Sequence, residues 1–311
     1  MSVLAARAET SRRSAAQRGA TSRTLISNAQ LNRPGSKLAY RIVLILVVVV
    51  FTLVFIGPLY FLFTDGLKST QEAGQVPPTF FPAQIHPSTY VSAWKTLSVG
   101  RLMFNTLYYA FGALAFQLIF DVAAAYAFSK LRPVLGNAIF GMMLVTLMIP
   151  STVLIVPQYL TVANLPILHV NLIGTPEAIW LPSVANAFNI FLLKRFFDSI
   201  PDELMDAAAI DGASPLRALR SIVLPISRPI LGVVTIFGFV AVWKDFLWPL
   251  LVESGYTPTR ETINVGITGA TTTPVNLIIA ASAMAAIPTI IFFLIFQRNI
   301  MSGLTAGGLK G

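Results

Sequence analysis

The side chains that could do chemistry in this sequence are few, and none of them forms a catalytic pattern. The chain has no cysteine, and its two histidines, His86 and His169, are far apart, so neither a thiol nucleophile nor a metal site is indicated. The stretch nearest to a nucleotide-binding loop, residues 66–70, lacks the adjacent Gly-Lys pair that contacts the phosphates of ATP. We therefore predict that the chain is not an enzyme and has neither a metal ion nor a cofactor of its own.

Polar side chains inside otherwise apolar stretches are the remaining candidates for function. Asp121 lies within one such stretch, and Ser183, Asn186 and Asn189 follow at intervals of three residues, which places them along one helix face. In a membrane these groups need partners in a neighbouring helix or in a water-filled path, since a buried acid costs about 2.5–3.5 kcal/mol. Trp243 lies near the end of another apolar stretch. Two interpretations stay open for all five: residues along a path for a polar solute, or structural and interfacial contacts.

The composition places these residues in a membrane protein. Of the 311 residues, 55% are hydrophobic and only 11% are charged, and the mean hydropathy is +0.72. Soluble domains have roughly a quarter of their residues charged, and a soluble core could not cover so much apolar surface with so few charges. A soluble enzyme, a disordered chain and a disulfide-rich secreted domain are therefore excluded. The net charge of +9 does not require a nucleic-acid partner, because cytoplasmic loops of membrane proteins collect Lys and Arg.

The apolar segments predict an all-α membrane domain over residues 40–311, in which membrane lipid surrounds the helices. Six spans are expected, at about 42–63, 104–128, 138–156, 178–193, 230–248 and 277–296. Residues 1–39 are rich in Ser, Ala and Arg and predict a disordered basic tail. This tail is expected to be solvated and to help set the orientation, with binding to anionic lipid as the alternative.

The distribution of basic residues predicts the orientation of the chain. Seventeen of the 22 Lys and Arg residues lie before the first span, after the second, between the fourth and fifth, or after the sixth. Loops with an excess of Lys and Arg remain in the cytoplasm. We therefore expect the N- and C-termini to be cytoplasmic.

The predicted cytoplasmic loop at residues 196–228 has a more specific pattern than a simple connector. Pro201 suits the first position of a helix, and the small residues that follow share one helix face. Gly212 is placed to end this helix, and Pro215 can begin another. The pattern predicts a rigid helix–break–helix element that a soluble partner can approach closely. An amphipathic segment at the membrane surface is the alternative.

The residues of this loop resemble the "EAA" loop of binding-protein-dependent ABC importers. That family pattern reads Glu-Ala-Ala-x3-Gly-x9-Ile-x-Leu-Pro, and the matching residues here are Asp206, Ala207, Ala208, Gly212, Ile222, Leu224 and Pro225. Asp206 stands where the family has Glu, which keeps the acid but shortens it by one methylene. The resemblance extends from about residue 40 to the end of the chain. It is closest to the maltose-type permeases of carbohydrate uptake.

The resemblance implies a type I importer permease fold with six transmembrane helices, in the cell membrane of a prokaryote. It also implies four kinds of partner: a second, non-identical permease, two cytoplasmic ATPases, an extracytoplasmic sugar-binding protein and a carbohydrate substrate. ATP would be bound by the ATPase subunits, and the seven matching residues would couple its hydrolysis to the spans. Which sugar, polyol or glycerol phosphate is carried does not follow from the sequence.

An ion-coupled secondary transporter of a small polar solute is the alternative function. Such a transporter would need several ionisable residues near the middle of the membrane and is often built from internal repeats. Asp121 is the sole clear candidate of this kind, and no repeat is visible. The sequence therefore favours the permease subunit.

Overall fold

The computed structural model describes residues 34–253 and 258–308, with side chains described for 37–253 and 259–299, and contains no strand in those ranges. The chain divides into two compact units, with the boundary between Phe61 and Leu62. The predicted disordered tail, residues 1–39, lies mostly outside the described residues.

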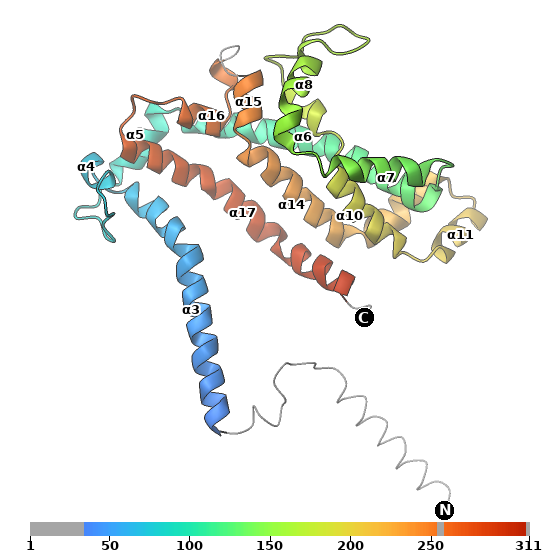
Figure 1. Ribbon diagram of the computed structural model, residues 1–311, viewed down its shortest axis with the longest axis horizontal. Coiled ribbons are helices and arrows are strands. Elements are labelled where there is room, and N and C mark those ends of the chain that lie inside the picture. The colour runs from blue at the N-terminus through green and yellow to red at the C-terminus, as the bar shows by residue number, and fades with distance from the viewer. Residues whose placement is uncertain (1–33, 254–257, 309–311) are drawn as a thin grey trace, which may run out of the picture. The chain divides into compact units, whose positions relative to one another are not determined.

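The first unit consists, in its described part, of helix α3 (Pro34–Asp65), which continues four residues past the boundary (Figure 1). Pro34 begins the helix, where its missing N–H leaves no hydrogen bond unmade. The segment from Lys37 to Asp65 has a mean hydropathy of 3.2. Its 29 residues rise about 44 Å, more than the roughly 30 Å of a hydrocarbon core. The helix therefore contains the predicted first span.

The second unit is built around the long helix α6 (Val99–Tyr126). It packs against α10 (Ala187–Asp198), α14 (Arg228–Lys244) and α17 (Val275–Gly308), and α17 also packs against α14 and α5 (Ser88–Thr96) (Figure 1). The other α-helices are shorter: α4 (Thr70–Ala73), α7 (Gly136–Thr146), α8 (Ser151–Ala163), α9 (Glu177–Trp180), α11 (Glu203–Ile210), α12 (Pro215–Ala218), α13 (Leu224–Ile226), α15 (Leu247–Val252) and α16 (Ile263–Thr268).

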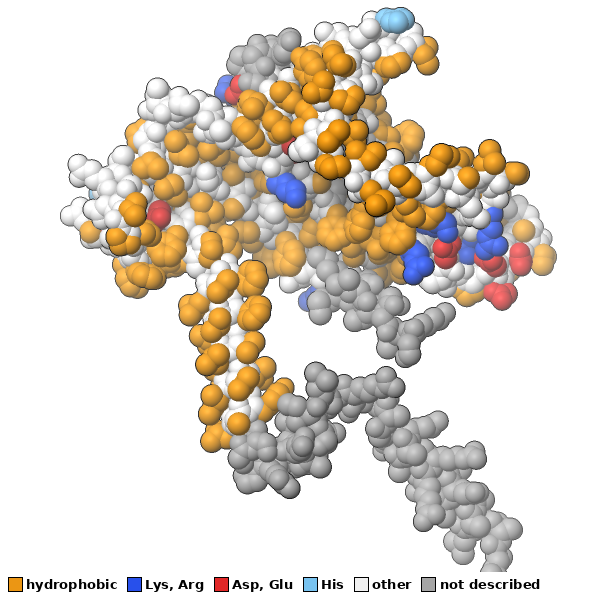
Figure 2. Space-filling view, in the orientation of Figure 1, with side chains coloured by type: hydrophobic (Ala, Val, Ile, Leu, Met, Phe, Trp, Pro, Cys, Tyr) orange, Lys and Arg blue, Asp and Glu red, His pale blue; other side chains and the backbone are white. Residues whose placement is uncertain are grey.

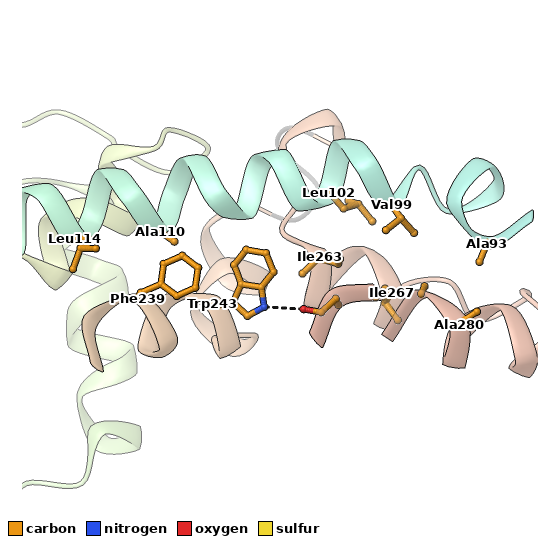
Figure 3. Close-up of a cluster of buried hydrophobic side chains, with 12 residues drawn as sticks. Ala93, Val99, Leu102, Ala110, Leu114, Phe239, Trp243, Ile263, Ile267 and Ala280 are labelled. Atoms are coloured by element: carbon orange, nitrogen blue, oxygen red, sulfur yellow. Dashed lines mark hydrogen bonds between the residues drawn. The ribbon is translucent and has the colours of Figure 1, made fainter. Parts of the chain in front are cut away.

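A buried apolar cluster holds α6, α14, α16 and α17 together (Figure 3). Phe239 of α14 stacks on Phe292 of α17, with ring centroids 3.9 Å apart. Trp243 lies in the same cluster, and its indole Nε1 donates a hydrogen bond to the Ala285 carbonyl oxygen at 3.1 Å. The fully buried Ala281 shows that small residues let the helices approach closely here.

The predicted third span is bent, and a second bend lies just before the predicted fifth span. The third corresponds to α7 and α8, which meet at 108° across Leu147–Pro150, and α14 leaves the segment Pro215–Ile226 at 85°. Three helices among the described residues are long and apolar enough to cross a membrane, or up to five if each bent pair is one span.

The segment predicted as the fourth span, residues 178–193, is interrupted. It consists of α9, the 3-10 turn η2 (Leu181–Ser183), a non-helical stretch and then α10, which continues to residue 198. Asn186 has extended backbone angles, φ −110° and ψ 110°, and begins α10 from outside the helix. A hydropathy average over the whole segment does not locate this interruption.

Candidate functional site

The predicted coupling loop, residues 196–228, contains a short exposed helix whose C-terminal end is fixed by a glycine. Helix α11 ends where Gly212 adopts a left-handed φ of 72°. The Gly212 N–H donates to the Ala209 carbonyl at 3.0 Å, and the Ala213 N–H donates to the Ala208 carbonyl at 2.9 Å. This pair of hydrogen bonds is the Schellman motif, which favours glycine at the left-handed position. The predicted helix stop at Gly212 is confirmed.

Some of the residues that match the family pattern are exposed, and others pack against neighbouring residues. Asp206 and Ala207 are exposed on α11, whereas Ala208 is buried against the rest of the unit. Ile222 and Leu224 are half-buried, near the π-helical turn η3 (Leu219–Val223), and Pro225 is exposed. The first part of the pattern is therefore available for contact, and the second part joins the loop to the bundle.

Charged side chains attach this loop to the turn that follows α6. Lys130 donates to the Ile200 carbonyl at 2.6 Å and to the Asp202 carboxylate at 2.7 Å. Arg132 donates to the other oxygen of Asp202, also at 2.7 Å. Ser129 donates to the Asp198 carboxylate at 2.7 Å. Lys and Arg (blue) and Asp and Glu (red) gather at this end of the second unit (Figure 2).

This network holds the carboxyl group of Asp202 in its charged form. Hydrogen bonds from Lys130 and from Arg132, together with the attraction of their charges, lower the pKa of Asp202 below its ordinary value. The Lys130 side chain is 4% exposed, so one partner of the ion pair is removed from solvent while the Asp202 side chain is 51% exposed. The ion pair therefore fixes the position of the residue that precedes α11.

We expect the Asp202→Asn variant to unfold at a lower temperature than the wild type at neutral pH, and to lose this difference in acid. Because the folded pKa of Asp202 lies below the unfolded value of about 3.9, its contribution is complete above that value and disappears as the pH falls through the folded pKa. Thermal unfolding of the purified protein in detergent, measured across a pH series, checks this.

Asp211→Asn is the matched control for this experiment, because Asp211 is exposed on the same loop and forms no ion pair with the described residues. A difference between wild type and Asp202→Asn that stays constant down to pH 2 would contradict the assigned role.

The polar residues predicted inside the spans lie together at the interruption before α10. The Asp121 carboxylate, fully buried on α6, accepts a hydrogen bond from the Asn186 backbone N–H at 2.9 Å. The Asn186 side chain accepts from the Asn189 backbone N–H at 3.0 Å. Ser183 lies one turn earlier and donates to the Ile179 carbonyl at 3.1 Å. These contacts satisfy the free N–H groups that an interrupted helix leaves in an apolar environment.

Two cavities open along this interruption. One, of about 320 Å³, lies between α10 and α14 and is lined by Asn186, Asn189 and Lys244 together with apolar residues that include Phe188 and Phe237. The other, of about 280 Å³, lies beside α8 and α15 and is lined by residues that include Ser151, Gln158, Ser183, Asp245 and Trp248. Polar groups from several separate segments thus border the two cavities.

Two residues of the predicted path, Asp121 and Trp243, border neither cavity, and Trp243 lies apart from the other predicted path residues. Its side chain is 5% exposed and belongs to the packed cluster of Figure 3, and it borders neither of the two cavities. The physical reason is the Ala285 carbonyl, which gives the indole N–H a partner inside the core.

Sequence reasoning missed the next residue along, Lys244, which was counted as a charge outside the membrane. It also missed the roles of Lys130 and Arg132. A lysine inside the predicted fifth span, residues 230–248, was the available signal for Lys244. The described residues contain no group of three side chains that could bind a metal ion.

Candidate membrane spans, an interrupted helix beside a polar groove, and a rigid exposed loop define a subunit of a membrane transport system. Residues 121–305 match the family described as "Binding-protein-dependent transport system inner membrane component". The chain belongs to this family, and the match includes Asp121, the groove and the whole coupling loop. It is accordingly a multi-pass permease of a bacterial inner membrane, as the resemblance of the loop predicted.

Individual relatives agree with this assignment. The chain is 33% identical over 261 residues to the "sn-glycerol-3-phosphate transport system permease protein UgpE" of Escherichia coli O1:K1, covering 81% of this chain and 91% of that protein. It is 32% identical over 262 residues to the protein of the same name from Salmonella typhi, with the same coverage. Among solved structures, a bacterial ABC transporter involved in the import of the acidic polysaccharide alginate is similar in fold, with a TM-score of 0.70 and 23% identity over 88% of this chain and 99% of that chain.

Proposed function

We propose that this chain is one of two permease subunits of an ATP-driven carbohydrate importer. The names of the similar proteins give sn-glycerol-3-phosphate and alginate as their cargoes, and both are polyhydroxylated. The other components of the importer are a second, non-identical permease, two cytoplasmic ATPases and an extracytoplasmic sugar-binding protein. The ATPases bind and hydrolyse ATP. This sequence has no phosphate-binding loop pattern, which supports the assignment of ATP hydrolysis to the ATPase subunits.

The observation that carries the proposal is the exposed, rigid form of the coupling loop. Around α11, Leu204, Ile210 and Leu216 expose 40%, 87% and 73% of their surface, a group of apolar side chains that suits a protein partner. The helix stop at Gly212 and the ion pairs of Asp202 hold this surface in place. A rigid element of this kind transmits movement of the docked ATPase to α6 and α14.

We assign both termini and the coupling loop to the cytoplasm. The distribution of Lys and Arg supports this orientation. With six spans, seventeen of the 22 Lys and Arg residues lie on the same side of the membrane as the coupling loop.

Ser183, Asn186 and Asn189 are assigned to the translocation path, and the two cavities that they border support this. Asp121 and Trp243 are assigned to holding the helices in position. Asp121 is fully buried beneath the interruption, and Trp243 is bonded to α17.

The experiment is reconstitution of this chain with its partner permease, ATPases and binding protein. We expect uptake of a carbohydrate into proteoliposomes to require ATP on the ATPase side and to be unaffected by ionophores. Omission of the ATPases should abolish uptake. Uptake by this chain alone, without ATP and abolished by an ionophore, would instead show an ion-coupled secondary transporter.

A further inference from the structure

The groove between α10 and α14 contains one cation without a counterion. Lys244, the last residue of α14, lines it together with Asn186 and Asn189. The four ion pairs formed among the described side chains involve Lys68, Lys130, Arg132 and Lys194, and Lys244 takes part in none of them.

The neighbouring acid is engaged in another contact. The Asp245 carboxylate accepts hydrogen bonds from backbone N–H groups at the start of α15, with the Trp248 nitrogen 3.5 Å away. Its charge attracts Lys244, but the two groups form no ion pair within 4.0 Å. The Lys244 ammonium is therefore exposed in the groove and able to bind an anion.

The place of Lys244 at the end of α14 puts its ammonium near one surface of the membrane. Helix α14 has 17 residues and rises about 25 Å, less than the roughly 30 Å of the hydrocarbon core. Arg228 at its first position is placed at one membrane surface. Lys244 then lies about 5 Å short of the opposite surface. At this depth its ammonium borders both the cavity and the solvent side of the membrane.

We propose that Lys244 binds an oxyanion of the cargo, so that the importer carries an acidic carbohydrate, a sugar acid or a sugar phosphate. The inference deepens the proposed function and rests on it. Asn186 borders the same groove as the ammonium, and amides bind hydroxyl groups. The rings of Phe188 and Phe237, 6.0 Å apart, supply an apolar surface for a sugar face. A neutral sugar would leave the ammonium without a counterion.

The test uses the complete importer in vesicles of phosphatidylcholine alone, which contain no anionic lipid headgroup. Uptake is measured for matched neutral and acidic probes: galactose and galacturonate, glucose and glucose 6-phosphate, glycerol and glycerol 3-phosphate. We expect the acidic member of a pair to be imported. Lys244→Gln should raise its KM at least tenfold. Lys244→Arg should restore the KM, and Lys95→Gln, on the exposed surface of α5, should not change it.

The absence of cysteine allows a second, electrostatic measurement. Ala241→Cys places a single thiol in the groove. We expect an anionic methanethiosulfonate reagent to react faster relative to a cationic one when Lys244 is present than when it is replaced by Gln. The acidic probe should protect the thiol. This readout does not depend on transport by the Lys244→Gln variant.

Three outcomes would overturn the inference. The first is import of the neutral probes alone, and the second is an unchanged KM and an unchanged reagent preference in Lys244→Gln. The third is loss of the partner permease from the Lys244→Gln complex, which would show that Lys244 pairs with an acidic residue of that partner. Import of neutral probes would leave the proposed function standing. Absence of ATP-dependent uptake of any carbohydrate would contradict the proposed function itself.

Discussion

Replacing Gly212 with valine should abolish ATP-driven uptake while the protein still inserts into the membrane. The backbone at Gly212 has φ 72°, a region that a β-branched residue adopts only with strain, at a cost of roughly 1–2 kcal/mol. A Cβ at this position would meet no atom within 4 Å, so the penalty comes from the backbone and not from a clash. The chain would relieve it by extending or redirecting α11, which moves the surface offered to the ATPase.

The measurement compares uptake with ATP hydrolysis in the reconstituted complex. We expect hydrolysis that no longer responds to the binding protein, with normal amounts of the variant in the membrane. Gly212→Asn is the matched control, because asparagine tolerates the left-handed region, and it should retain most of the uptake. Normal uptake by Gly212→Val would refute the docking role of the loop.

Replacing Gly112 with alanine should have the second large effect, because it disturbs the contact that positions the interrupted helix. The backbone of α6 at Gly112 lies against the indole of Trp180, the last residue of α9. A Cβ at this position would lie 2.3 Å from the Trp180 ring atom Cε2. Tyr108 and Phe116, one turn to either side of Gly112, contact the same indole with ring centroids 5.2 and 6.0 Å away. The indole is therefore held from three positions and has little freedom to move.

Overpacking of this kind costs about 1–3 kcal/mol, and the displaced α9 would shift the groove residues that follow it. We expect Gly112→Ala to lower both the unfolding temperature in detergent and the rate of uptake. Gly141→Ala, in helix α7 with no atom within 4 Å of its new Cβ, supplies the control. It gains helix propensity without a clash, so it should be at least as stable as the wild type. Equal stability of the two variants would show that the indole moves freely.

The structural features that could be predicted from the sequence are those that depend on residues close together in the chain. An all-α membrane protein follows from the long apolar segments, and this prediction is confirmed, as is the family of the coupling loop. The end of α11 could be predicted because a Schellman motif joins residues only a few positions apart, with glycine at the left-handed position. The helix of the predicted first span could be predicted because α3 is apolar on all sides.

The remaining features depend on residues that are distant in the chain. The interruption before α10 is stabilised by Asp121, 65 positions earlier, whose carboxylate accepts the freed Asn186 N–H. Trp243 lies in the core because the Ala285 carbonyl is there to accept its proton, and Lys130 is paired because Asp202 folds back to it.

Sequence alone determined that the chain enters a membrane, since transfer of apolar residues from water depends on composition and local order. Tertiary structure decided which polar groups are satisfied within the protein and which face a cavity, because that depends on the partners that packing brings within about 3 Å. The Asn186 backbone N–H, which donates to Asp121, is satisfied within the protein, whereas the Lys244 ammonium faces a cavity.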